Sequence, residues 1–325
     1  MSVSVATQFR YSHCIGVLSA SGRGFSNPID IAFGPGETLY VLNRSNWRNM
    51  EQGAGMRITR CTIGEEYLGE FAGPGTGDAQ FTWPTAIATD SQGNIYVSDE
   101  HRHDVQVLTP DGQLIRKWGS YGSAPNQLNR PSGLAIDSQD RIVVVDHLNA
   151  RIKVFSTTGE LLAAWGSAGS GPGEFNMPWG VGLDAQDQIY VADWRNSRVQ
   201  KFSQDGQWLA SFGGRDEGDG SLNRPAGVGI DSDGNVYVAD WSDDRVQIYR
   251  PDGSYLATIT GDADLSKWGY EYLLGNSYIF DERAKVEDFG PEKRFWGPTA
   301  VKIHPSGKIL VADSCRHRIQ IYDRA

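Results

Sequence analysis

The sequence predicts an all-β protein, a six-bladed β-propeller with four-stranded antiparallel blades. One phrase recurs after 47 residues, as IYVADWRNSRVQKFS at 189–203 and VYVADWSDDRVQIYR at 236–250. Alternating apolar stretches in each copy are separated by tight-turn signals. The 39 Gly and 14 Pro in 325 residues also favour turn-rich strands over helices.

Six units open in the same way, with a large apolar residue three positions before a proline. These pairs are Phe25/Pro28, Phe81/Pro84, Leu128/Pro131, Phe175/Pro178, Leu222/Pro225 and Phe295/Pro298. After the proline come a short apolar run, a turn such as DSDGN, a stretch ending in Asp, an Arg-led stretch, a turn such as PDG and a last strand. Four strands joined by short turns match one propeller blade.

The two ends of the chain predict how the ring closes. The sixth unit stops after RIQIYDRA, one strand short, and the N-terminal HCIGVLSASGRGFSNP resembles the passage AAWGSAGSGPGEFNMP that leads into another blade. The N-terminal strand is therefore expected to complete the last blade beside the C-terminal strand, which leaves no long unpaired edge. Residues 1–325 are expected to form a single domain.

Composition and sequence patterns disfavour several classes of function. A formal charge of −10 and a pI near 5.1 disfavour nucleic acid as a partner. The sequence has neither an 18-residue apolar stretch nor a leader-like start, so we expect a cytoplasmic protein that does not enter a membrane. Three irregularly spaced cysteines do not suggest a disulfide framework. The sequence lacks a phosphate loop and a dinucleotide fingerprint, so no nucleotide or flavin cofactor is expected.

The repeated phrase resembles a known family. The pattern VADxxNxRIQxF, present as VADWRNSRVQKF, VADWSDDRVQIY, VVDHLNARIKVF and VADSCRHRIQIY, is similar to the NHL repeat of six-bladed propellers. The resemblance covers the whole chain and implies the fold. It leaves the activity open, because such propellers include scaffolds, RNA-binding domains and metal-dependent lyases that cleave peptidyl-hydroxyglycine or virginiamycin B.

Residues shared by most blades are expected to be structural. The second predicted strand ends in Asp99, Asp146, Asp193, Asp240 or Asp313, and Arg151, Arg198, Arg245 and Arg318 stand five places after the last four. We predict that these pairs bridge strands and cap turns, because a ring of repeats does not need a catalytic group in each blade.

Two insertions predict lids over the central channel. Loops between second and third strands, and between blades, open on one face of a propeller, which we call the mouth face. The insertions 44–56 and 261–294 both fall on such loops. Long excursions among short connections are often lids or binding loops.

Aromatic residues predict a binding surface on the mouth face. The candidate substrate-binding residues are Trp47, Arg48, Trp83, Trp179, Trp194, Arg195, Trp241, Trp268, Tyr270 and Trp296. Indole rings suit an aromatic, cationic or sugar-like ligand. Alternatively, these rings cover the disc or dock a protein. Trp118 and Trp165 are expected to pack between blades instead.

Charged residues break a pattern of small residues on the innermost strands. Asp30 and Lys302 occupy positions where other blades carry Gly or Ala. Because an unpaired buried charge is costly, we expect them to face each other or water in the channel. The pair is either a structural ion pair or a catalytic one, with Lys302 as a base or anion anchor held by Asp30.

Histidines on the predicted mouth loops suggest a metal site. The candidate ligands are His101, His103, His147 and His317, and the metal would be zinc or calcium. His103 and His147 are also candidate catalytic residues. The resemblance to the amidating lyases implies a ligand role for His103, but none of the six prolines is followed by the His that supplies another ligand there. His317 also fits the ordinary motif.

Two hypotheses follow. In the first, the chain binds a small molecule that is aromatic, cationic or sugar-like. The most specific version of this hypothesis is a metal-dependent lyase or hydrolase that acts on such a substrate. Alternatively, it is a non-catalytic scaffold that docks a protein on the same face.

Overall fold

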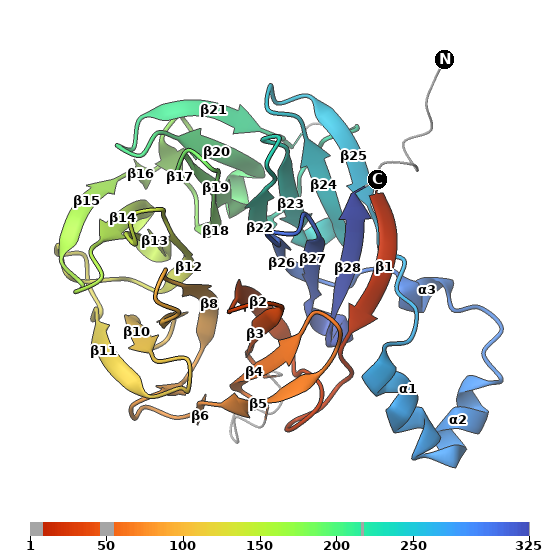
Figure 1. The fold of residues 1–325 in the computed structure, drawn as a ribbon. Coiled ribbons are helices and arrows are strands. Elements are labelled where there is room, and N and C mark those ends of the chain that lie inside the picture. The colour runs from red at the N-terminus through yellow and green to blue at the C-terminus, as the bar shows by residue number, and fades with distance from the viewer. Residues whose placement is uncertain (1–8, 46–54, 216–217, 325) are drawn as a thin grey trace.

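The computed structural model describes residues 9–45, 55–215 and 218–324, and it confirms the predicted six-bladed β-propeller (Figure 1). Six four-stranded antiparallel sheets surround a central axis in this part of the chain. None of the helices in the described residues is long and apolar enough to cross a membrane.

The strands follow the order expected from the repeats. Blade 1 contains β2 (Pro28–Phe33), β3 (Thr38–Asn43), β4 (Arg57–Thr62) and β5 (Tyr67–Phe71). Blade 2 contains β8 (Pro84–Thr89), β9 (Ile95–Asp99), β10 (Asp104–Leu108) and β11 (Leu114–Trp118). Blade 3 contains β12 (Pro131–Ile136), β13 (Ile142–Asp146), β14 (Arg151–Phe155) and β15 (Leu161–Trp165). Blade 4 contains β18 (Pro178–Leu183), β19 (Ile189–Asp193), β20 (Arg198–Phe202) and β21 (Trp208–Phe212).

Blade 5 contains β22 (Pro225–Ile230), β23 (Val236–Asp240), β24 (Arg245–Tyr249) and β25 (Tyr255–Ile259). Blade 6 contains β26 (Pro298–Ile303), β27 (Ile309–Asp313), β28 (Arg318–Arg324) and β1 (Phe9–Ile15). Short parallel pairs, β6 (Gly73–Pro74) with β7 (Gln80–Phe81) and β16 (Ser167–Ala168) with β17 (Glu174–Phe175), lie in connections between blades.

The ring closes as predicted. β1 pairs antiparallel with β28, with Ile15 opposite Ile319 and Phe9 opposite Arg324. The two ends of the chain therefore share one sheet, and hydrogen bonding between them joins the first and last units of the ring.

Each blade packs against both neighbours because successive side chains along a strand point to opposite faces of the sheet. Ile189 and Val191 point into a core shared with blade 3, whereas Tyr190 and Ala192 point into a core shared with blade 5. All four side chains are buried. The strand IYVAD is apolar on both faces for this reason, as expected for a strand covered on both sides.

The predicted packing role of Trp118 and Trp165 is also confirmed. Trp118 lies 5.9 Å from Phe155 of the next blade, and Trp165 lies 6.3 Å from Phe202 of the blade after that. These ring contacts join successive blades near their outer strands.

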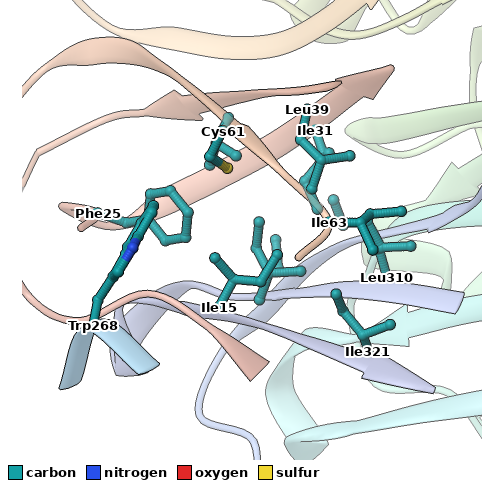
Figure 2. Close-up of a cluster of buried hydrophobic side chains, with 13 residues drawn as sticks. Ile15, Phe25, Ile31, Leu39, Cys61, Ile63, Trp268, Leu310 and Ile321 are labelled. Atoms are coloured by element: carbon teal, nitrogen blue, oxygen red, sulfur yellow. The ribbon is translucent and has the colours of Figure 1, made fainter. Parts of the chain in front are cut away.

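The insertion 261–294 contains the helices α1 (Lys267–Leu274), α2 (Ser277–Arg283) and α3 (Gly290–Lys293). They lie at the outer edge of the disc beside β1 (Figure 1). Trp268 is 3% exposed and packs against Phe25, with ring centroids 5.9 Å apart (Figure 2). The ring centroid of Tyr67 lies 6.4 Å from that of Trp268. The carboxylate of Glu65 accepts hydrogen bonds from the backbone N–H groups of Lys267 and Trp268 at the N-terminus of α1.

Residues 261–294 are not among those that line the cavities at the channel and its mouth in the described part of the chain. The anchor just described, a buried indole and a carboxylate at a helix N-terminus, holds α1 against the edge where blades 1 and 6 meet. A lid role for this insertion stays a prediction. In the other insertion, 44–56, residues 46–54 lie outside the described residues.

We predict that the inner strands tolerate no added side chain where they cross closest. A Cβ at Gly180 would collide with the carbonyl oxygen of Ala226 on the next blade, whereas a Cβ at Gly73 would meet nothing within 4 Å. Gly180→Ala should lower the free energy of unfolding by about 3 kcal/mol or more. Gly73→Ala should change it by no more than about 0.5 kcal/mol. Equal urea midpoints for the two variants would contradict this packing.

Candidate functional site

The loops of the mouth face build a cavity of 220 Å³, which we call the aromatic hollow. It is lined by Ile29, Arg44, His147, Met177, Trp179, Trp194, Trp241 and Thr299. These residues come from blades 1, 3, 4, 5 and 6, so the ring brings together segments that are distant in sequence. Most of the lining is apolar, and three indole rings dominate it.

A repeated joint fixes each mouth loop. Asp193, fully buried at the end of β19, accepts a hydrogen bond from the backbone N–H of Asn176 at 2.8 Å. Its second oxygen accepts from Arg198 Nε at 3.0 Å and from the Asn196 amide at 2.8 Å. Burial raises the pKa of Asp193, and these donors oppose that rise. The predicted role of the strand-end aspartates in bridging strands and capping turns is confirmed.

The same joint recurs in all six blades. In every case the side chain that ends the second strand accepts the backbone N–H of the residue 17 positions earlier. The acceptors and donors are Asn43 with Ser26, Asp99 with Thr82, Asp146 with Asn129, Asp193 with Asn176, Asp240 with Asn223, and Asp313 with Trp296.

The residue directly after each joint differs between the blades. These residues are Arg44, Glu100, His147, Trp194, Trp241 and Ser314. Four of the six line the aromatic hollow. The joint is therefore constant while the next residue is variable, which is the arrangement expected of a binding site on a repeated scaffold.

The rings of the hollow are held at defined angles. His147 and Trp179 lie 5.1 Å apart, edge to face, at 86°. Trp194 and Trp241 lie 6.4 Å apart at 44°. Trp241 is 38% exposed, so it stands at the open side of the hollow.

Among the described residues, His147 is the one titratable acceptor that lines this hollow. Its Nδ1 lies 2.8 Å from the carbonyl oxygen of Pro178, so Nδ1 carries the proton and donates it. The remaining nitrogen, Nε2, is then an acceptor. Burial lowers the pKa of His147, so the ring is neutral near pH 7.

An ion-pair bridge supports the other side of the hollow. The carboxylate of Glu100 accepts from Arg44 at 2.8 Å and from Arg130 at 3.1 Å, and so joins blades 1, 2 and 3. The Arg44 guanidinium lies 4.1 Å from the ring centroid of Trp83. Burial lowers the pKa of Arg44 to about 10, which leaves it charged at neutral pH.

Glu100 was not among the residues singled out from the sequence. The signal was present, because Glu100 occupies the position of His147 and Trp194 in their blades. A comparison of that one position across blades would have found it.

The channel pair Asp30 and Lys302 lies beneath the hollow. Lys302 Nζ is 3.1 Å from one carboxylate oxygen of Asp30, and the other oxygen accepts from the backbone N–H of Ile87 at 3.0 Å. The cavity around them measures 30 Å³, which is room for about one water molecule. The two charges face each other as expected. Lys302 also lines a second cavity of 350 Å³ along the inner strands.

Two of the candidate metal-ligating histidines join blades. Nδ1 of His103 accepts the backbone N–H of Arg130 at 3.0 Å, and Nδ1 of His317 accepts that of Asn27 at 3.0 Å. Asp244, at the same place in blade 5, accepts from Gly297 at 2.7 Å. Burial lowers the pKa of both histidines, as suits a nitrogen that accepts a hydrogen bond.

Within residues 9–45, 55–215 and 218–324, no three His, Cys, Asp or Glu side chains gather in a way that could hold a metal ion. The metal site predicted from His101, His103, His147 and His317 therefore has no ligand group in the described residues, and no step below depends on a metal.

The other predicted binding residues are dispersed. Trp83 is covered by Arg44, and Trp296 is 55% exposed outside the hollow. Trp268 belongs to a core cluster, and Tyr270 is 51% exposed on α1 at the edge of the disc. Arg195 lines a neighbouring cavity. Trp47 and Arg48 lie outside the described residues.

The fold and the hollow define the class of this protein: a six-bladed β-propeller with an aromatic cavity at the mouth of its channel. The family model described as "NHL repeat" matches residues 81–108, 128–155, 175–202, 222–249 and 295–322. The chain is therefore an NHL-repeat propeller. A search of curated proteins found no match.

Solved structures share this fold at low sequence identity. A catalytically inactive variant of virginiamycin B lyase from Staphylococcus aureus, solved with quinupristin, is 11% identical with a TM-score of 0.58, over 97% of this chain and 89% of that one. A streptogramin B lyase is 10% identical with a TM-score of 0.59, over 99% and 100%. A Bacteroides thetaiotaomicron protein of unknown function is 18% identical with a TM-score of 0.62, over 97% and 73%. These likenesses concern the fold alone.

We predict that the Glu100 bridge stabilises the mouth face. Glu100→Gln removes the charge that compensates the buried Arg44, so the free energy of unfolding should fall by about 3 kcal/mol. Glu282→Gln breaks an exposed pair with Lys285 and should change it by less than about 0.5 kcal/mol. Urea unfolding at pH 7 measures both. A Glu100→Gln variant as stable as the control would show that the bridge contributes nothing.

Proposed function

We propose that the aromatic hollow binds a small organic molecule with a flat, largely apolar body. The observation that carries this proposal is the lining: Trp179, Trp194 and Trp241 surround one cavity at the channel mouth. Flat aromatic walls favour flat apolar ligands through burial and ring contacts. The volume of 220 Å³ is below the usual range of about 300–1,000 Å³ for ligand pockets, so a body of one or two rings fits best.

The arginines near the hollow disfavour a cationic ligand. Arg44 lies over the ring of Trp83, and Arg224 lies 4.8 Å from the ring centroid of Trp194. Guanidinium groups thus already occupy ring faces that a ligand cation would use. Of the ligand classes expected from the sequence, the aromatic class is the one this geometry favours.

A lyase or hydrolase activity is the second candidate, and His147 is the observation that favours it. A neutral histidine whose Nε2 is an acceptor can take a proton from a bound substrate. A screen of lactones, cyclic esters and amidated-peptide precursors should then find turnover that His147→Phe abolishes. Turnover that survives this change would exclude His147 as the base.

Protein docking is the competing hypothesis for the same face. The exposed ring of Trp296, with Arg316 at 5.4 Å from its centroid, favours it. Docking on Trp296 would leave the aromatic hollow without a role, so ligand binding in the hollow separates the two hypotheses.

We predict that the neutral probe 2-naphthamide binds in the hollow and that Trp241→Ala weakens binding by about tenfold or more, because one apolar wall is lost. Isothermal titration calorimetry measures the dissociation constant. The matched control is Trp208→Ala on the outer strand β21, since Trp208 is 42% exposed and Trp241 is 38% exposed. Equal weakening by the two variants, or no binding to the unaltered protein, would contradict the proposal.

A further inference from the structure

A second cavity lies beside the aromatic hollow and contains a cluster of arginines. This cavity measures 230 Å³, and we call it the arginine hollow. It is lined by Asn176, Trp194, Arg195, Ser197, Arg215 and Arg224. Trp194 lines both cavities, so the two hollows adjoin across one indole ring.

The three arginines of this cavity differ from most others in the protein. Most arginines of the described residues pair with a carboxylate, as Arg198 does with Asp193 and Arg245 with Asp240. The side chains of Arg195, Arg215 and Arg224 form no ion pair and no hydrogen bond with other described residues. Among the described residues, no acidic residue lines the cavity, and Asp216 and Glu217, which follow Arg215 in the sequence, lie outside the described part of the chain. In a chain with a formal charge of −10, three neighbouring positive charges without an acidic partner in the described residues are a local reversal of sign.

Contacts with Trp194 place two of these charges. The guanidinium of Arg224 lies 4.8 Å from the ring centroid of Trp194, and that of Arg195 lies 5.9 Å from it. Stacking on an indole limits the directions in which a guanidinium can point while its N–H donors stay available. Trp194 itself follows the buried Asp193 and is held by that joint.

All three arginines are exposed, so water screens much of their mutual repulsion, and an anion in the cavity would reduce it further. An anionic group with planar or tetrahedral oxygens matches the fork of guanidinium donors, and charge-assisted bonds to it are strong. Because the neighbouring cavity accepts a flat apolar body, one ligand can occupy both.

We propose that the arginine hollow is an anion subsite and that the ligand of this protein is an aromatic anion. Its ring lies in the aromatic hollow, and its carboxylate, sulfonate or phosphate group contacts Arg195 and Arg224. The inference rests on the proposed function, because it assigns a chemical class to the molecule bound there.

A pair of probes that differ in charge and share one ring system tests this proposal. 2-Naphthoate should bind at least about tenfold more tightly than 2-naphthamide, and this preference should shrink as the salt concentration rises. The double variant Arg195→Gln/Arg224→Gln should lose the preference for naphthoate and still bind naphthamide. The control variant is Arg294→Gln, which removes one exposed arginine that has no side-chain partner among the described residues and lies outside the cavity. It should keep the preference.

The outcomes separate the two proposals. Equal binding of the two probes to the unaltered protein would overturn the anion subsite and leave the proposed function standing. A preference that survives the double variant would also overturn the subsite, since the charge would then be recognised elsewhere. If neither probe binds, both proposals fail.

Discussion

The mouth face depends on one constraint: a buried side chain at the end of the second strand accepts a backbone N–H group from the loop that enters its own blade. In every blade the donor stands 17 positions earlier, and the acceptor is a carboxylate in blades 2 to 6 and the Asn43 amide oxygen in blade 1. In blades 3 to 6 an arginine five places later compensates the charge. A carboxylate is costly to bury and is tolerated only with such partners, so the donors and the acceptor specify one loop geometry. The residue after the joint is then free to vary without loss of its position.

This division explains how a repetitive chain can carry one specific site. Arg44, His147, Trp194 and Trp241 follow equivalent joints, yet each contributes a different chemistry to the same cavity. The charges differ as well: Arg44 is neutralised by Glu100, whereas Arg195 and Arg224 have no acidic partner in the part of the chain that the structure describes. An apolar cavity beside a cationic one therefore arises from substitutions at a few loop positions, while the blades keep the same cores.

The sequence predicted what the repeat encodes. The 47-residue period specifies strands, turns, joints and closure, because these depend on contacts within a blade or between adjacent blades. Features outside the repeat could not be predicted in this way. Trp268 lies in an insertion outside the repeat. Its position depends on contacts with Phe25, Tyr67 and Glu65, which are distant in sequence. The hydrogen bonds that His103 and His317 accept from the next blade are likewise not visible in the sequence, where the two residues stand only as candidate metal ligands. Trp179 and Trp241, which line the aromatic hollow, could be singled out from the sequence because tryptophan on a mouth loop stands out in any single blade.

The central claim is that the buried joints position the residues that bind the ligand, and the joint of Asp193 is the most direct place to test it. Asp193→Asn keeps the size of the side chain and removes the charge that holds Arg198 and the turn carrying Trp194. The account predicts that the free energy of unfolding falls by about 3 kcal/mol and that 2-naphthoate binds more weakly, measured by urea unfolding and calorimetry on the same preparation. Unchanged stability together with unchanged naphthoate affinity would contradict it.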